Sequence, residues 1–255
     1  MVHKTLVNGT AFEISGGKTL VNGTAYSIKN GKTLVGGTAY EVSFSKPLNE
    51  YAIGDLVSLN VNGIPTKFIV VHHGLPSSLY DSSCNGTWLL MKDCYTSMSY
   101  SDSSEKLDYA DSNVHKYLNN TFFNLLDDDI KSVTKQIKLP YCDGDDKSIK
   151  SGGNGLSTKI FSLGGREVGL GSAISWLPED SVKLDYFIEG DDYKSEARER
   201  RNVSGSKPWW LRTPSPSSLA DYVVNVSYGG TFGKTSTTTV HSVRPALILP
   251  SDTIL

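Results

Sequence analysis

Few residues of this chain have the type and spacing that catalysis needs. His72 and His73 are adjacent on a predicted strand, so their side chains point to opposite faces and do not easily share one metal ion. Cys142 has the thiol of a nucleophile, but no basic partner stands near it in the sequence. We therefore expect no catalytic residues, and surface or packing roles for the two histidines.

Acidic and glycine-rich runs resemble ligand sites but lack the register that such sites use. The aspartates at 127–129 and 143–146 have neither the alternating oxygen spacing of an EF-hand loop nor its terminal glutamate. The run Gly164 to Gly171 lacks the GxGxxG register and the Lys-Ser or Lys-Thr pair that follows a phosphate loop. We expect a turn at this run, no dedicated metal site and no cofactor.

The composition is that of a globular chain. Of 255 residues, 38% are hydrophobic and 10% aromatic, which is enough for a sizeable core. The formal net charge of -2 argues against the basic stripe of a nucleic-acid-binding surface, and the one basic cluster, 198–201, is short and interrupted. No run is long enough to span a bilayer, and no signal peptide precedes the first repeat. We predict no nucleic-acid partner, no membrane insertion, and synthesis in a bacterial-type cytoplasm.

The cysteines do not form a disulfide framework. Their number is odd, three, and no CxxC spacing is present. Cys84 and Cys94 could bridge a hairpin, but buried free thiols are the simpler interpretation.

Strand and helix signals alternate from about residue 45 onward. Asn62-Gly63 predicts a hairpin turn, and 88–92 has the pattern of a buried strand. The clearest helix begins near Asp111 or Ser112, and the aspartates at 127–129 open another helical turn. The run 246–249 predicts a last strand that returns to the sheet. The fold class is therefore α+β.

A near-identical unit of strand, turn and strand occurs three times at the N-terminus, with a period of fourteen residues: 4–14, 18–28 and 32–42. Asn8-Gly9 and Asn22-Gly23 suit two-residue hairpin turns, and Gly36-Gly37 replaces them in the third copy. One such hairpin cannot bury an apolar face alone. Residues 1–44 are either an oligomerisation or attachment segment or a spacer of weak hairpins.

The last quarter of the chain contains two apolar frames around a polar run. Trp209 to Pro214 opens this region and Val243 to Leu247 closes it. We expect the frames to lie in the core, with Arg212 or Arg244 paired to a buried carboxylate or to backbone carbonyls. The run between them is built of small polar residues and tyrosine, as in binding loops carried by a rigid scaffold.

The polar run supplies the candidate ligand-binding residues. We expect Val224 and Val226 to face inward, and Asn225 and Ser227 to face outward. The alternative is a solvated strand edge without a ligand. The candidates are Ser215, Ser217, Ser218, Asp221, Tyr222, Asn225, Ser227, Tyr228, Thr231, Lys234, Ser236, Thr237, Thr238, Thr239 and His241.

Residues 45–255 resemble a family of bacterial and phage domains with a C-type-lectin-like fold, related to the formylglycine-generating enzymes. The segments that carry this resemblance are 88–92, 109–123, 159–168, and the frames Trp209 to Pro214 and Val243 to Leu247. The resemblance implies a ligand-binding domain that displays segment 213–242. The calcium motifs of vertebrate-type lectins and the paired cysteines of the formylglycine-generating enzymes are absent.

Some members of that family resemble the variable proteins of diversity-generating retroelements, including phage tropism determinants. The resemblance implies adenine-directed mutagenesis, which favours Asn, Tyr, Ser, Thr, Asp and Gly. The N-terminal repeat is similar to repeats at the head of phage tail proteins. Together they imply a receptor-binding protein of the virion tail, without a cofactor, whose partners are a host cell-surface protein or glycan and tail or baseplate proteins. A homo-oligomer, by default a trimer, is expected. The alternatives are a divergent formylglycine-generating-type enzyme and a bacterial surface adhesin.

Overall fold

The computed structural model contains two compact units, one ending at Lys46 and the other running from Pro47 to Thr253. It describes residues 45–104, 108–143, 148–171, 174, 176–187, 208–215 and 221–255, and the backbone of strands at 4–7, 10–13, 18–21, 24–27, 30–35, 38–43, 201–202 and 205–206.

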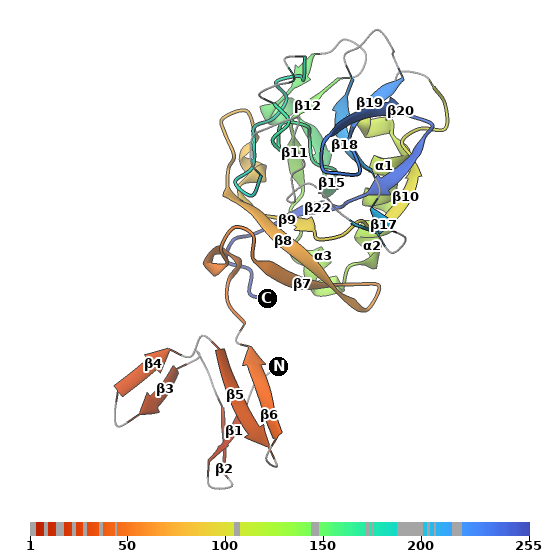
Figure 1. Cartoon of the computed structure of the whole chain (residues 1–255). Helices are drawn as coiled ribbons and strands as arrows, with labels where there is room; N and C mark the ends of the chain where they lie inside the picture. Colours follow the sequence, from red (N-terminus) through yellow and green to blue (C-terminus); the bar gives the residue numbers. More distant parts are fainter. Residues whose placement is uncertain are drawn as a thin grey trace. The chain divides into compact units, whose positions relative to one another are not determined.

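The first unit consists of three separate antiparallel hairpins, one for each repeat (Figure 1). Their strands are β1 (Lys4–Val7), β2 (Thr10–Glu13), β3 (Lys18–Val21), β4 (Thr24–Ser27), β5 (Asn30–Val35) and β6 (Thr38–Ser43). The same register recurs in each copy, with Thr5 opposite Phe12, Thr19 opposite Tyr26 and Thr33 opposite Tyr40. The predicted strands are therefore confirmed, whereas the predicted turn residues lie outside the described residues.

One five-stranded antiparallel sheet runs through the middle of the second unit, in the order β15-β22-β9-β8-β7. Its strands are β7 (Leu56–Val61), β8 (Ile64–Gly74), β9 (Gly86–Met91), β15 (Ile160–Phe161) and β22 (Ala246–Leu249). The hairpin at Asn62-Gly63 is confirmed, and Asn62 takes the positive φ of 53° that this turn requires. The predicted strand at 246–249 is also confirmed, paired between β15 and β9.

A second five-stranded sheet has the order β10-β21-β18-β19-β20. Its strands are β10 (Thr96–Ser99), β18 (Trp209–Pro214), β19 (Tyr222–Val226), β20 (Phe232–Ser236) and β21 (Val240–Val243). Strands β18 and β21 are parallel, and the other neighbours are antiparallel. The region between the two frames therefore supplies three strands of this sheet.

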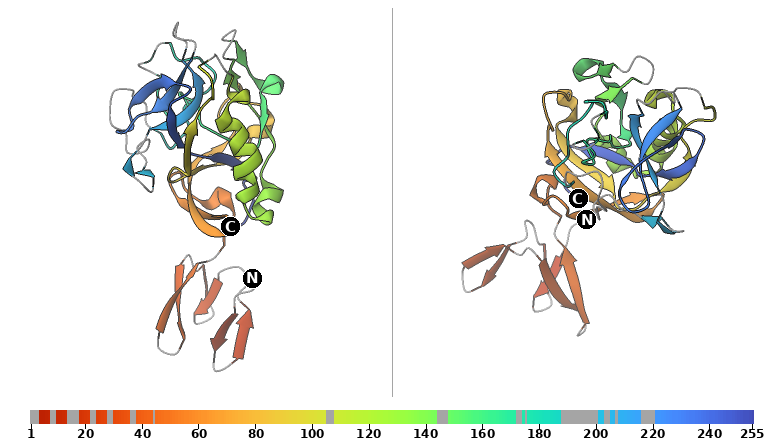
Figure 2. Two further views of the ribbon diagram at one scale, coloured as in Figure 1. Left: turned by 90° about the vertical axis from the view of Figure 1, so that its right-hand side faces the viewer. Right: turned by 45° about the horizontal axis from the view of Figure 1, so that its top comes forward.

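Helical segments lie along one side of the second unit (Figure 2, left). The Ser112 hydroxyl accepts from the His115 amide at 3.0 Å, so the predicted N-cap is confirmed. The segments are α1 (Asn113–Tyr117), a π-helical stretch η4 (Leu118–Phe122), α2 (Phe123–Leu125) and α3 (Asp128–Val133), with short turns η1 (Leu48–Glu50), η2 (Ser82–Cys84), η3 (Tyr109–Asp111) and η5 (Gly152–Asn154). Short two-stranded sheets pair β11 (Ile137–Leu139) with β14 (Leu156–Thr158), β12 (Tyr141–Cys142) with β13 (Ile149–Lys150), and β16 (Arg201–Asn202) with β17 (Gly205–Ser206).

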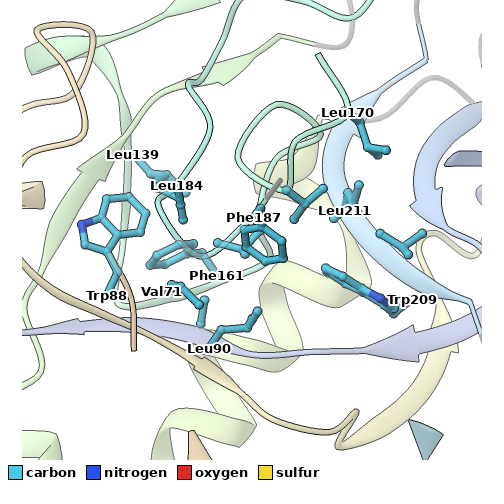
Figure 3. Close-up of a cluster of buried hydrophobic side chains, with 14 of the residues drawn as sticks. Val71, Trp88, Leu90, Leu139, Phe161, Leu170, Leu184, Phe187, Trp209 and Leu211 are labelled. Atoms are coloured by element: carbon cyan, nitrogen blue, oxygen red, sulfur yellow. The ribbon is translucent and has the colours of Figure 1, made fainter. Parts of the chain in front are cut away.

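Apolar side chains cover both faces of the central sheet, which explains its nearly continuous hydrophobic strands. Leu90 and Ile248 point into one core cluster, whereas Leu89 and Leu247 point into the other. Figure 3 shows the first cluster, in which Trp88 of β9 and Trp209 of β18 enclose Phe161 and Phe187. The fold is α+β, with two sheets joined through shared cores.

Candidate binding surface

The first frame lies in the core, as predicted. Trp209, Trp210, Leu211 and Arg212 of β18 are fully buried. The Arg212 guanidinium binds Glu167 in a bidentate pair, with Nη1–Oε2 at 2.6 Å and Nη2–Oε1 at 2.7 Å. Burial alone would lower the pKa of Arg212, but the charge and hydrogen bonds of Glu167 outweigh it and hold that pKa above its ordinary value. A buried ion pair thus anchors β18, the strand that leads into segment 213–242.

The second frame is anchored in a similar way. Arg244 is fully buried, donates from Nε to the Met91 carbonyl at 2.8 Å, and places its guanidinium 5.0 Å from the ring centroid of Trp209. The prediction that Arg212 or Arg244 pairs with a buried carboxylate or with backbone carbonyls is confirmed: Arg212 binds the Glu167 carboxylate, and Arg244 binds the Met91 carbonyl.

Asp180 is a second buried carboxylate near Arg212. It is fully buried, the Ser181 hydroxyl donates to its Oδ1 at 2.8 Å, and no described residue donates to its Oδ2. Burial raises the pKa of Asp180, and the opposing attraction of Arg212 does not cancel this effect. The folded protein therefore binds this proton more tightly than the unfolded chain does.

Because the folded protein binds the Asp180 proton more tightly than the unfolded chain does, the direction in which stability changes with pH can be predicted. The contribution of Asp180 is fully present below its ordinary pKa of 3.8 and is lost as the pH rises through its raised pKa in the folded state. An Asp180→Asn variant resembles the protonated carboxyl, so we expect it to gain stability relative to the wild type as the pH increases from 4 to 7. Chemical denaturation at several pH values measures this gap. A gap that is constant or shrinks with pH would contradict the assignment.

Strand β19 between the frames is buried on both faces from Val223 to Val226. Val224 and Val226 face the first core cluster, as predicted. The prediction that Asn225 faces outward is wrong, because Asn225 is only 2% exposed and lies opposite Trp210 in the sheet. A strand covered on both sides buries its polar residues as well, and alternation alone does not reveal the second layer.

A chain of hydrogen bonds connects Asn225 to the surface. Asn225 Nδ2 donates to Thr235 Oγ1 at 2.9 Å, and His241 Nε2 lies 3.2 Å from the same oxygen. His241 Nδ1 lies 3.0 Å from the Val240 carbonyl, which assigns the proton to Nδ1 and makes Nε2 the acceptor. Burial lowers the pKa of His241, which favours this neutral form. The ring packs against Trp210 in a tilted arrangement, with a centroid distance of 4.5 Å.

The predicted site residues divide by burial. Ser215 and Thr237 are buried, like Asn225, so they do not form part of an exposed surface. Ser217 and Ser218 lie outside the described residues. Three candidates are exposed, Tyr228, Lys234 and Thr238. Those that are partly exposed are Asp221, Tyr222, Ser227, Thr231, Ser236, Thr239 and His241. The exposed positions lie on β20 and on the connections at its two ends. Side-chain hydrogen bonds join Ser236 to Asp221 and Ser227 to Thr231.

Three further residues belong to this surface and were missed from the sequence. Val240 is 62% exposed, and the Trp176 ring packs edge-on against Phe232 at 5.3 Å. Trp176 comes from a loop far away in the sequence, so no local pattern could have revealed it. Val240 could have been found from the sequence, because an apolar residue is unusual in a run rich in hydroxyl side chains.

The other candidates have structural surroundings. His72 contacts Asp185 at 2.7 Å and His73 contacts Thr87 at 3.0 Å, so the predicted separation of the two histidines is confirmed. The three cysteines are buried and free, and burial raises the pKa of the Cys84 thiol to about 12. Among the described residues, no group of three His, Cys, Asp or Glu side chains is arranged to hold a metal ion. No helix of the described part has the length and apolar character to cross a membrane.

Comparison with known proteins gives one match. No curated protein and no solved structure matches the chain. The family described as a domain of unknown function, DUF6273, matches residues 85–251. This range begins just before β9 and ends just after β22, so it includes both frames and the surface between them. Since the match covers more than half of the chain, the protein belongs to the DUF6273 family.

Proposed function

We propose that residues 45–255 form a non-catalytic receptor-binding domain with a C-type-lectin-like fold. Its binding surface is made by the exposed residues of the displayed segment 213–242. In this proposal the protein is a phage or prophage tail receptor-binding protein, located on the virion tail, and retroelement mutagenesis diversifies its C-terminal surface. Its partner is a host cell-surface protein or glycan.

One observation carries the proposal. Between two frames that are buried except at Pro214, the chain presents Tyr228, Lys234 and Thr238 to solvent, while Val223 to Val226 of β19 stay in the core. A rigid base with exchangeable exposed residues is the arrangement of a recognition surface. Tyrosine supplies large contact area at low entropic cost, and hydroxyls supply adaptable hydrogen bonds. Two of these three exposed residues, Tyr228 and Thr238, are of the types that adenine-directed mutagenesis favours.

The hairpins of residues 1–44 suit attachment or oligomerisation in this proposal. Each is a two-stranded sheet, which is marginally stable by itself in water. Repeated registers place residues of the same type at the same positions in all three copies, so equivalent hairpins of other subunits can stack on them. We propose a homo-oligomer, by default a trimer, that attaches to tail or baseplate proteins.

Binding of the labelled full-length chain to a panel of bacterial strains tests the proposed function. For a strain that binds, the double variant Tyr228→Ser/Val240→Ser is expected to lose at least about tenfold in affinity, because exposed aromatic anchors dominate such interfaces. The matched control is Ile64→Ser, since Ile64 and Tyr228 are both 63% exposed and Ile64 lies on the other sheet. Equal binding by the double variant, or an equal loss in the control, would contradict the proposal.

A further inference from the structure

Strand β20 ends the second sheet, and no described strand pairs with its outer edge. The bonds Thr237 N to Asp221 O and Ser227 N to Thr231 O, both 2.8 Å, fix the pairing at the two ends of the β19–β20 ladder. Because hydrogen-bonded pairs alternate in an antiparallel ladder, Gly233 and Thr235 bond to β19. Phe232 and Lys234 therefore direct their N–H and C=O groups away from the sheet. No described residue bonds to these groups.

Parts of the two edges of the central sheet are covered, at Val61 of β7 and at Ile160 of β15. On β7, Val61 bridges to Leu126, and the Asn62 amide donates to the Leu125 carbonyl at 2.6 Å. On β15, the Asn119 side chain bonds both the carbonyl and the amide of Ile160, at 2.9 and 3.2 Å. Proteins close exposed edges because an open edge pairs with other chains. The outer edge of β20 is thus a place where another chain can add a strand.

The side chains along this edge define what it would accept. Phe232 and Lys234 share one face of β20, opposite Val226 and Val224 of β19. Trp176 lies beside them, with its ring against Phe232 and the Lys234 ammonium 5.8 Å from its centroid. The positive charge of Lys234 therefore lies two residues along the strand from Phe232, which packs against Trp176 in an aromatic pair that is partly open to solvent.

A second copy of β20 fits this edge poorly. Only one antiparallel register pairs all five residues of β20 with another β20, and that register places Lys234 opposite Lys234. Like charges directly opposite each other destabilise a strand pair. The charge favours instead a segment with an acidic residue opposite Lys234 and apolar residues two positions away, against Phe232 and Trp176.

We propose that β20 binds an extended segment of a partner protein as an added strand, through main-chain hydrogen bonds to Phe232 and Lys234. The recognised segment alternates apolar and polar residues around a central Asp or Glu. This proposal rests on the proposed function and narrows the partner from a protein or glycan to a protein.

A synthetic peptide tests the edge directly in the full-length chain. The probe is acetyl-Thr-Val-Thr-Glu-Thr-Val-Thr-amide, which is symmetric about its glutamate. Of the four tryptophans, Trp88, Trp209 and Trp210 are fully buried and Trp176 is 39% exposed. Acrylamide quenching of tryptophan emission therefore reports on the site. We expect saturable protection with a Kd on the order of 0.1–1 mM, suitable for a short added strand.

Two controls separate strand addition from other contacts. N-methylation of the glutamate and valine amides removes the donors that face β20 and should abolish binding, whereas N-methylation of the inner threonine amides should leave it unchanged. Lys234→Glu should weaken binding roughly fivefold and favour a probe with lysine in place of glutamate. Lys67→Glu, on the exposed part of β8 in the other sheet, should change neither.

The outcomes are distinguishable. Absence of saturable protection at millimolar peptide, or equal loss with both methylated probes, would overturn the added-strand proposal. Loss of strain binding in the Tyr228/Val240 variant would still support receptor binding in that case. Conversely, loss of binding with the probe methylated at the glutamate and valine amides, but not with the threonine-methylated probe, supports the edge site even where no strain binds.

Discussion

Replacing Arg212 with methionine is expected to destabilise the second unit by about 3–5 kcal/mol, the usual cost of breaking a buried ion pair. The substitution leaves the Glu167 and Asp180 carboxylates buried without their cation. It also removes the donors to the Pro140 and Ser162 carbonyls, both at 3.2 Å. Chemical denaturation, followed by the emission of the buried tryptophans, measures the loss.

Arg166→Met is the matched control for this prediction. Arg166 stands next to Glu167 in the sequence, and its partner Glu179, 3.7 Å away, has a side chain that is 85% exposed. It also bonds two backbone carbonyls, so we expect a cost of about 1 kcal/mol. In the double variant Arg212→Met/Glu167→Leu, removal of the orphaned carboxylate should recover part of the stability. Similar losses for Arg212→Met and Arg166→Met would contradict the anchoring role of the pair.

The sequence predicted those elements whose signals are local. The Asn62-Gly63 hairpin, the Ser112 N-cap and the buried strand at 246–249 each follow from neighbouring residues, and all three are confirmed. The burial of the frames could also be predicted, because two tryptophans in succession are seldom left exposed.

Local sequence signals could not predict which residues distant in the chain come together in the fold. That Arg212 requires a carboxylate follows from its burial, but the choice of Glu167 depends on a turn that lies 45 residues earlier. Asn225 has the same local pattern as an exposed strand residue, but in the fold it lies opposite Trp210 in the sheet and is only 2% exposed. Trp176 joins the surface across a similar gap in the sequence.

These placements restrict which positions of the displayed region can change freely. Asn225 and Thr237 belong to the base, whereas Tyr228, Lys234 and Thr238 are exposed. Any diversification compatible with folding should therefore concentrate on the exposed positions and spare the buried ones. Gly233 offers the sharpest test of this division between buried and exposed positions. It is a small residue in a polar run, and it is next to the exposed Lys234.

Gly233→Val is expected to cost about 2–4 kcal/mol through overpacking and a broken buried hydrogen bond. A Cβ at Gly233 would lie 2.3 Å from Asn225 Oδ1, so the amide must move and lose its bond to Thr235. Strand propensity favours valine over glycine, so the direction of the effect depends on the clash. Lys234→Val, one residue away, is exposed and should change the free energy of unfolding by less than about 0.5 kcal/mol.

A double-mutant cycle identifies the atoms responsible for the cost of Gly233→Val. Asn225→Ala alone removes the hydrogen bond to Thr235 and leaves a cavity beside Trp210. If the clash with the Asn225 amide causes the loss, valine at position 233 fills space that alanine vacates, and the double variant is more stable than the sum of the single effects predicts. Strict additivity would mean that Gly233 is required for another reason, and the region would then tolerate change at Asn225 more freely than its burial implies.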